Sequence, residues 1–215
     1  PNNREILYAS THLAGAECPA PPAPRADRKY LWQVSPSYDI FVANLKGTIT
    51  KQLTNSPGYD AEATVSPTGD KIVFTSDRSG DLELWTMNID GTDQKQITFG
   101  LGYDGGAFFS PDGKRLVFRA SRPTTAEEVE EYKTLLSEGL VAPTNMEIYT
   151  CNVDGSALNQ VTNLGKANAL LYGFKQVIRS NPEIEFLGFM DADFSAPMSE
   201  LLKLFDVAMV ENLDF

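Results

Sequence analysis

A repeat of 44 residues, turn residues at fixed places within it, and strand-like alternation between those turns predict a mainly β fold. We expect a partial β-propeller of about three blades in residues 1–164, followed by a small α/β fragment in residues 165–215. The spacing of apolar residues differs between the two parts, so a change of architecture is expected near Asn168.

The repeat becomes visible when the chain is compared with itself at an offset of 44 residues. Residues 59–100 form one complete unit, and residues 103–164 form a second unit that is longer by 20. An earlier unit is marked by the match of Tyr8 to Phe74 and carries an insertion of 22 residues. The pairs that carry the repeat are Tyr59-Asp60 with Tyr103-Asp104, Ser66-Pro67 with Ser110-Pro111, and Ile72-Val73-Phe74 with Leu116-Val117-Phe118.

Each unit is expected to contain four short strands. Alternating apolar positions such as Ile72 and Phe74 have the period of two that is typical of half-buried strands. Turn residues separate these stretches, since Pro-x-Gly favours a tight turn and Asp-Gly favours a hairpin. Units of about 40–45 residues with four strands are typical of propeller blades. The turns are Pro67-Thr68-Gly69, Pro111-Asp112-Gly113, Asp90-Gly91, Asp154-Gly155 and Lys46-Gly47.

Two stretches, VSPTGDKIVFTSDRSGDLELWTMNIDG and FFSPDGKRLVFRAS, resemble blades of TolB-like propellers, a branch of the WD-like repeat proteins. The resemblance covers about residues 4–164. It implies a rigid platform that binds or scaffolds protein partners. Three blades fall short of the roughly four to eight that close a ring, so the open edges are also expected to favour self-association.

Two insertions interrupt the blades. Residues 11–36 hold five prolines and are expected to form a loop with little regular structure. In residues 122–142, Thr125 and Glu128 have the spacing of a capping box, and Gly139 is placed to end the helix that follows. This helix is expected to pack on one face of the blades, either covering the surface or gating a ligand.

Composition excludes several classes of function. The net charge of −11 and the lack of a Lys/Arg cluster argue against nucleic-acid binding. No apolar run is long enough for a membrane span. His12, Cys18 and Cys151 are one ligand short of a zinc site built from His and Cys alone, and no nucleophile elbow occurs. Whether the two cysteines pair stays open.

The sequence begins at Pro1 without an initiator Met or an apolar signal segment, so we expect a processed or truncated chain. Its compartment is left open: periplasmic if the propeller part decides it, cytoplasmic if the C-terminal part does.

Six acidic residues lie within the repeat units, and their side chains have the oxygen ligands that calcium prefers. The alternative is that these residues have a structural role, in which they fix turns or pair with Arg78 and Arg115. We favour this alternative, because no compact loop contains enough of the six to bind an ion. The six are Asp60, Glu62, Asp77, Asp81, Glu83 and Asp104.

The last part of the chain follows a different pattern. Residues 166–180 have the apolar spacing of an amphipathic helix, and Pro182 ends it. Residues 184–190 form a nearly continuous apolar run, as buried parallel strands do, and a second helix begins near Leu201. Helix, strand and helix make an α/β pattern.

The stretches GKANALLYGF and EFLGFMDADFSAPMSELLKLFD resemble family 2 glycosyltransferases such as dolichyl-phosphate mannose synthases, which have a GT-A type nucleotide-sugar fold. By this resemblance, Asp191 and Asp193 would bind Mg²⁺ or Mn²⁺ and the diphosphate of a nucleotide sugar, and Lys166 would lie near the donor. The resemblance covers only residues 165–215 and lacks the family's first strand and acceptor region, so a working transferase site is not expected.

Three hypotheses follow for the function. The first is that the chain is a propeller-based binding module for protein partners, and this hypothesis favours a role other than that of an enzyme. Alternatively, it is a metal-dependent glycosyltransferase that uses Asp191 and Asp193. The third is that two fragments, joined at Leu164–Asn168 by recombination, design or assembly error, have no evolved function together.

Overall fold

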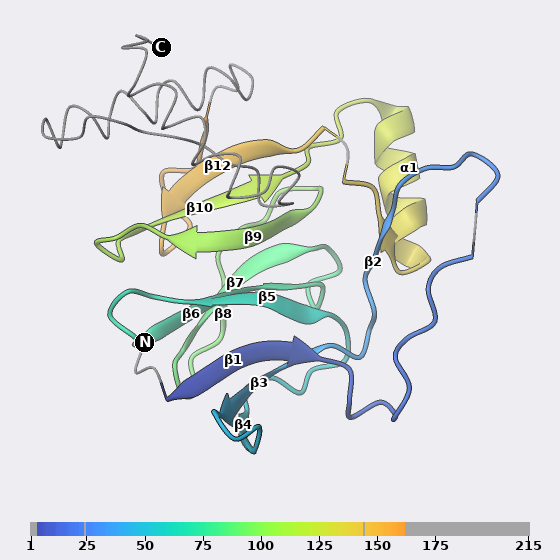
Figure 1. Ribbon diagram of the computed structural model, residues 1–215. Coiled ribbons are helices and arrows are strands. Elements are labelled where there is room, and N and C mark those ends of the chain that lie inside the picture. The colour runs from blue at the N-terminus through green and yellow to red at the C-terminus, as the bar shows by residue number, and fades with distance from the viewer. Residues whose placement is uncertain (1–3, 24, 144, 162–215) are drawn as a thin grey trace, which may run out of the picture. The chain divides into compact units, whose positions relative to one another are not determined.

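The computed structural model describes residues 4–23, 25–143 and 145–161, and three antiparallel sheets in these residues lie face against face (Figure 1). The sheets follow one another along the chain, so each is one blade and the middle blade has a neighbour on both sides. The expected mainly β fold is therefore confirmed for the described residues. The predicted α/β fragment of residues 165–215 and the boundary at residue 164 lie outside them.

The middle and third blades each have the four strands expected from the repeat. In both, the predicted turns join the first strand to the second and the third to the fourth, and Gly69 and Gly113 in the first of these turns have positive φ angles of 76° and 70°. The middle blade consists of β5 (Asp60–Val65), β6 (Lys71–Ser76), β7 (Glu83–Asn88) and β8 (Lys95–Gln96). The third blade consists of β9 (Asp104–Phe109), β10 (Arg115–Ala120), β12 (Glu147–Asn152) and β13 (Asn159–Gln160).

The first blade has three described strands where four were expected. Its order is β1 (Glu5–Ser10), β3 (Asp39–Asn44) and β4 (Ile49–Gln52). Because Tyr8 of β1 matches Phe74 of β6 in the repeat, β1 corresponds to the second strand of a complete blade. The counterpart of β5 is therefore not among the described strands.

Burial of the strands depends on how many neighbours a blade has. Ile72, Val73 and Phe74 of β6 are all 0% exposed, although the alternation predicted a half-buried strand. The difference arises because the middle blade packs against other blades on both faces. In β10 of the third blade, alternation is visible: Leu116 is 1% exposed and Val117 is 39% exposed.

Two apolar cores lie between the blades. The first joins Ile40, Val42 and Leu53 of the first blade and its loops to Ile72, Phe74 and Met87 of the middle blade. The second joins the middle and third blades, and its members are Val73, Leu84, Ile97, Ala107, Leu116, Phe118, Ala120 and Cys151. Because both cores span two blades, neither blade of a pair buries its apolar face alone.

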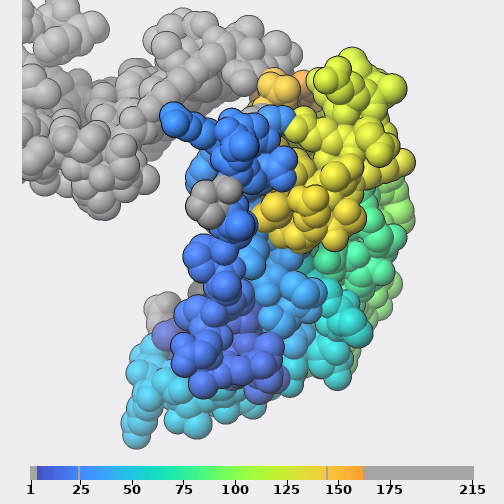
Figure 2. Space-filling model, turned by 90° about the vertical axis from the view of Figure 1, so that its right-hand side faces the viewer, coloured from blue at the N-terminus to red at the C-terminus, as the bar shows by residue number. Residues whose placement is uncertain are grey.

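The two insertions pair with each other, and residues 11–36 have little regular structure, as expected, apart from one two-residue strand. A short strand of the first insertion, β2 (Trp32–Gln33), is antiparallel to β11 (Leu140–Val141) of the second. Ion pairs between Arg25 and Glu138 and between Lys29 and Glu131 connect the same segments. Figure 2 shows the first insertion, in blue, lying along the second, in yellow.

The helix of the second insertion is α1 (Ala126–Ser137), and its predicted capping box is present. The Glu128 amide donates to the Thr125 hydroxyl at 3.2 Å, and the Glu128 side chain accepts from the Thr125 amide at 3.0 Å. Tyr132 and Leu135 are its buried residues, and Tyr132 joins an apolar cluster with Leu82 and Tyr103, so the helix packs on the blades as expected. Within residues 4–161 as described, no helix has the length and apolarity to cross a membrane.

Candidate functional site

Strands β5 and β9 lie against each other where the middle and third blades meet, and the pairing of both strands is irregular there. The register of β5 shifts between Ala61 and Thr64, as a β-bulge does. Glu62 inside this bulge has a positive φ of 55°, and Gly106, 44 residues later, has a φ of 60°. A glutamate in this conformation is uncommon and is held there by its surroundings, which marks Glu62 as a candidate functional residue.

Four donors hold the Glu62 carboxylate. The Tyr103 hydroxyl donates to Oε2 at 2.7 Å, and the Gly106 amide donates to the same oxygen at 2.7 Å. Thr75 donates at 3.1 Å, and Nη2 of Arg119 lies 3.4 Å from Oε1. The Arg119 contact is longer than the roughly 2.7–2.9 Å of a strong charge-assisted hydrogen bond, so the guanidinium is the loosest of the four partners.

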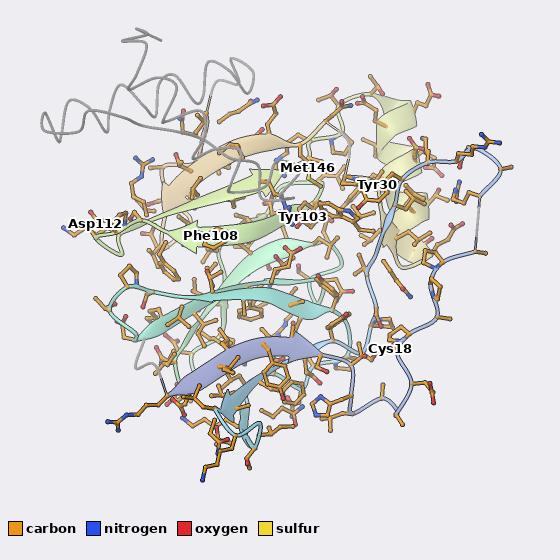
Figure 3. All side chains as sticks on the ribbon, in the orientation of Figure 1. Cys18, Tyr30, Tyr103, Phe108, Asp112 and Met146 are labelled. Atoms are coloured by element: carbon orange, nitrogen blue, oxygen red, sulfur yellow. The ribbon has the colours of Figure 1, made fainter. Side chains whose placement is uncertain are left out.

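Arg119 also lies over aromatic rings. Its guanidinium carbon is 4.7 Å from the ring centre of Trp32 and 5.8 Å from that of Tyr103. The two rings meet edge to face, with centres 6.0 Å apart. Trp32 is on β2, so the insertion completes this cluster, and Figure 3 shows Tyr103 on the side of the blades that faces the insertions.

These residues line a cavity of about 190 Å³, which we call the inner groove. A second hollow of about 470 Å³ shares Glu62 and Arg119 with it, so this pair separates the two spaces. The inner groove is lined by Trp32, Gln33, Val34, Tyr59, Glu62, Leu82, Tyr103, Arg119 and Val141.

Two tyrosines and one arginine of the inner groove keep their protons at neutral pH. Burial, followed by the negative charge of Glu62, raises the pKa of Tyr103, so its hydroxyl stays protonated and donates. Burial also raises the pKa of Tyr59. Burial alone would lower the pKa of the Arg119 guanidinium. The interactions with Tyr103 and Glu62 are together larger, so the pKa is raised. The groove therefore presents the Arg119 guanidinium, with Glu62 beside it, among aromatic rings.

The six repeated acidic residues have structural partners in the described part of the chain. Asp60 forms an ion pair with Arg78 at 2.7 Å, as predicted. Asp77 accepts from the Tyr59 amide at 2.7 Å, and Asp81 accepts from the Gly102 amide at 3.1 Å, so both fix turns. Within residues 4–161 as described, no three metal-ligating side chains of this kind converge.

The predicted role of Arg115 is wrong. Arg115 donates to Thr150 at 2.8 Å, whereas the partners of Glu62 and Asp104 are Arg119 and Arg122. The reason is position on the strand: Arg115 begins β10, four residues before Arg119, and so lies at its far end.

The remaining candidates separate into two groups. Cys18 is exposed and Cys151 is buried, and neither forms a disulfide. Burial raises the pKa of the Cys151 thiol to about 11. Lys166, Asp191 and Asp193 lie outside the described residues, so their roles with Mg²⁺ or Mn²⁺ and a nucleotide sugar stay predictions of the sequence.

A family model described as the TolB beta propeller domain matches residues 30–145, which is more than half of the chain. The chain belongs to this family. The TolB match includes β2 to β11. It also includes four lining residues of the inner groove that carry its chemistry: Trp32, Glu62, Tyr103 and Arg119. None of the predicted transferase segment, residues 165–215, falls within the match.

Solved TolB structures are also similar to the chain. A putative TolB from Agrobacterium tumefaciens has 22% identity and a TM-score of 0.47, over 57% of this chain and 40% of that one. TolB from Acinetobacter baumannii has 22% identity and a TM-score of 0.44, over 63% of this chain and 30% of that one. The chain thus spans less than half the length of either protein.

Proposed function

We propose that this chain is a binding module that holds an extended segment of a protein partner in the inner groove. Membership of the TolB propeller family supports a platform role, and the chemistry of the groove indicates what it holds. The observation that carries the proposal is the position of Arg119 over Trp32 and beside Tyr103.

The groove has the residue types that dominate binding energy at protein interfaces. Trp, Tyr and Arg are enriched among such residues because they combine large contact areas with a polar end. Trp32, Tyr59, Tyr103 and Arg119 all line one cavity of about 190 Å³. That volume suits a side chain or a short stretch of main chain better than a drug-sized ligand, whose sites begin at about 300 Å³.

Arg119 is the residue that we expect to contact the partner directly. Its side chain is 40% exposed, and its 3.4 Å contact with Glu62 leaves donors for another acceptor. Glu62 keeps three shorter hydrogen bonds when Arg119 turns to a ligand. We therefore expect a partner segment that presents a carboxylate or main-chain carbonyl groups to this guanidinium.

The test is selection of a displayed random peptide library on the immobilised full-length chain. Selected peptides should bind without added metal, and Arg119→Ala should weaken them by roughly 10- to 100-fold, the effect of losing a dominant interface residue. Binding would be measured by calorimetry, and circular dichroism would verify that the variant is folded.

Arg115→Ala is the matched control, because Arg115 is on the same strand but donates to Thr150 away from the groove. Binding to this variant should equal wild type. A selection that enriches no peptide, or equal losses for Arg119→Ala and Arg115→Ala, would refute the proposed site.

A further inference from the structure

Asp81 connects three parts of the chain beside the inner groove. It lies between β6 and β7, and its Oδ2 accepts from the Gly102 amide, in the connection to the third blade, at 3.1 Å. Its Oδ1 accepts from the Leu82 amide at 2.8 Å and from the Tyr132 hydroxyl of α1. Because Leu82 lines the inner groove, this one side chain joins the groove to the second insertion.

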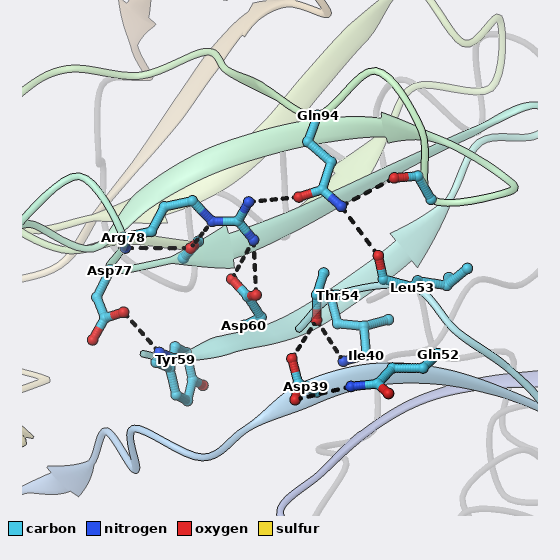
Figure 4. Close-up of polar contacts among 12 residues, drawn as sticks. Asp39, Ile40, Gln52, Leu53, Thr54, Tyr59, Asp60, Asp77, Arg78 and Gln94 are labelled. Carbon is cyan, nitrogen blue, oxygen red and sulfur yellow. Dashed lines mark hydrogen bonds and ion pairs between the residues drawn. The ribbon is translucent and has the colours of Figure 1, made fainter. Parts of the chain in front are cut away.

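The turns that precede the inner strands do not need the Asp81 carboxylate. Before the middle blade, the Tyr59 amide donates to Asp77 at 2.7 Å (Figure 4). Before the third blade, the Tyr103 amide donates to the Ser121 hydroxyl at 3.1 Å. Ser121 is 44 residues after Asp77, so it fixes the equivalent turn of the next blade.

The repeat also shows that a carboxylate is not required at the position of Asp81. Its counterparts in the first and third blades are Ser37 and Asn145. The glycine amide that matches the donor to Oδ2 belongs to Gly58, and it donates to the main-chain carbonyl of Pro36 at 3.2 Å. Of the three matching positions, the one that bonds to α1 has the carboxylate.

The second insertion connects Tyr132 to Trp32. Strand β11 follows α1 in the chain and is antiparallel to β2, where Val141 lies opposite Trp32. The Val34 amide donates to the Gly139 carbonyl at 2.7 Å and extends this pairing. Tyr132, Val34 and Val141 belong to one apolar cluster, and Trp32 packs against it. A displacement of Tyr132 is therefore passed to Trp32 through packed side chains and main-chain hydrogen bonds.

Polar contacts between α1 and the blades are few. In the described part of the chain, the bond from Tyr132 to Asp81 is the one side-chain hydrogen bond that joins α1 to a blade. The ion pairs of Arg25 and Lys29 with the second insertion are exposed, so they contribute little to its placement. Burial, followed by the negative charge of Asp81, raises the pKa of Tyr132, so its hydroxyl stays a donor.

We infer that Asp81 is a positioning residue of the inner groove, which acts through Tyr132 on Trp32. The hydrogen bond to Tyr132 fixes α1 and β11, and β2, which is paired with β11, then holds Trp32 over the Arg119 guanidinium. The consequence for a partner rests on the proposed function. A partner meets Trp32 and Arg119 already in place, so binding does not have to order the insertion.

The fluorescence of Trp32 tests the inference without a partner. The full-length chain has two tryptophans, and Trp85 is outside the inner groove, so Trp85→Phe leaves Trp32 as the single reporter. In this background, Tyr132→Phe removes the hydroxyl and keeps the ring. Acrylamide should then quench Trp32 more strongly, and its emission maximum should move to longer wavelength. Tyr149→Phe is the matched control, because Tyr149 is a half-buried tyrosine of β12 outside the groove, and it should leave both readings unchanged.

The conservative variant Asp81→Asn separates positioning from a loss of structure. Its side-chain oxygen can still accept from Tyr132, so quenching of Trp32 should stay near that of the parent. Asp81→Ala has no acceptor, so it should show the stronger quenching of Tyr132→Phe, while circular dichroism verifies that each variant is folded. Quenching in Tyr132→Phe equal to that of the parent, or quenching in Asp81→Asn as strong as in Asp81→Ala, would overturn the positioning role.

Peptide binding distinguishes this inference from the proposed function. Peptides selected on the wild-type chain should bind Tyr132→Phe roughly 10-fold more weakly, as the loss of one hydrogen bond to a charged group permits. If no peptide is selected but Trp32 is quenched more strongly in Tyr132→Phe, the proposed function fails and the positioning role is supported. If peptides bind Tyr132→Phe as tightly as wild type and quenching is unchanged, the positioning role fails and the proposed function stands.

Discussion

We expect Phe118→Ala to lower the free energy of unfolding by about 3–5 kcal/mol, because the change removes a buried aromatic side chain and leaves a cavity. Phe118 is 1% exposed, stacks on Tyr149 with ring centres 5.9 Å apart, and belongs to the core between the middle and third blades. Phe74→Ala, in the core between the first and middle blades, should lower the free energy of unfolding by a similar amount. Urea unfolding followed by circular dichroism measures both.

Phe99→Ala is the control for these variants. Phe99 is the same residue type but is 76% exposed, so its loss should change the free energy of unfolding by less than about 0.5 kcal/mol. Equal effects of Phe118→Ala and Phe99→Ala would contradict the packing of the third blade on the middle one.

Glu83→Gln should remove a pH dependence from stability. Burial raises the pKa of Glu83 from 4.5 to about 8, and the charge of Asp104 adds to this effect. The folded state therefore binds the proton more tightly than the unfolded state. Wild-type stability should fall as the pH rises from 4.5 to about 8, because the ionised carboxylate of the unfolded chain must then take up a proton to fold.

The glutamine variant has no such ionisation at this position, so its stability should fall less than that of wild type across that pH range. Above pH 8 it should exceed wild type by about 3–5 kcal/mol, since one unit of pKa corresponds to about 1.4 kcal/mol. Thermal unfolding at a series of pH values measures the difference. Glu130→Gln on the exposed face of α1 is the control, and its stability should depend on pH as that of wild type does. If the stability of Glu83→Gln also changes with pH in parallel with wild type, the Glu83 carboxyl is not buried in this way.

The blades were predictable from sequence because each is built from local signals. Offsets such as Phe74 to Phe118, together with Gly69 and Gly113 in the turns, identify strands that pair with their neighbours along the chain. The pairing of β2 with β11 was not predictable. It joins two-residue strands more than 100 residues apart, and neither has a repeat or a periodic pattern.

The inner groove could be predicted only in part. Tyr59 and Tyr103 are visible as repeated residues, but nothing local indicates that Trp32 of an insertion covers Arg119. Glu62 appears in the sequence as one acidic residue among six, and only its backbone conformation distinguishes it. The signal that could have been used is the pairing of Glu62 with Gly106 in the repeat, because glycine at one position indicates a positive φ at both.

Hydrogen exchange of the full-length chain, read by mass spectrometry, tests most directly the claim that the middle blade is enclosed by its two neighbours. We predict that amides of β6 and β7 exchange the slowest, together and only through global unfolding, whereas those of β4 and β13 exchange sooner by local opening. Exchange of β6 and β7 as fast as that of β4 and β13 would contradict this arrangement of blades.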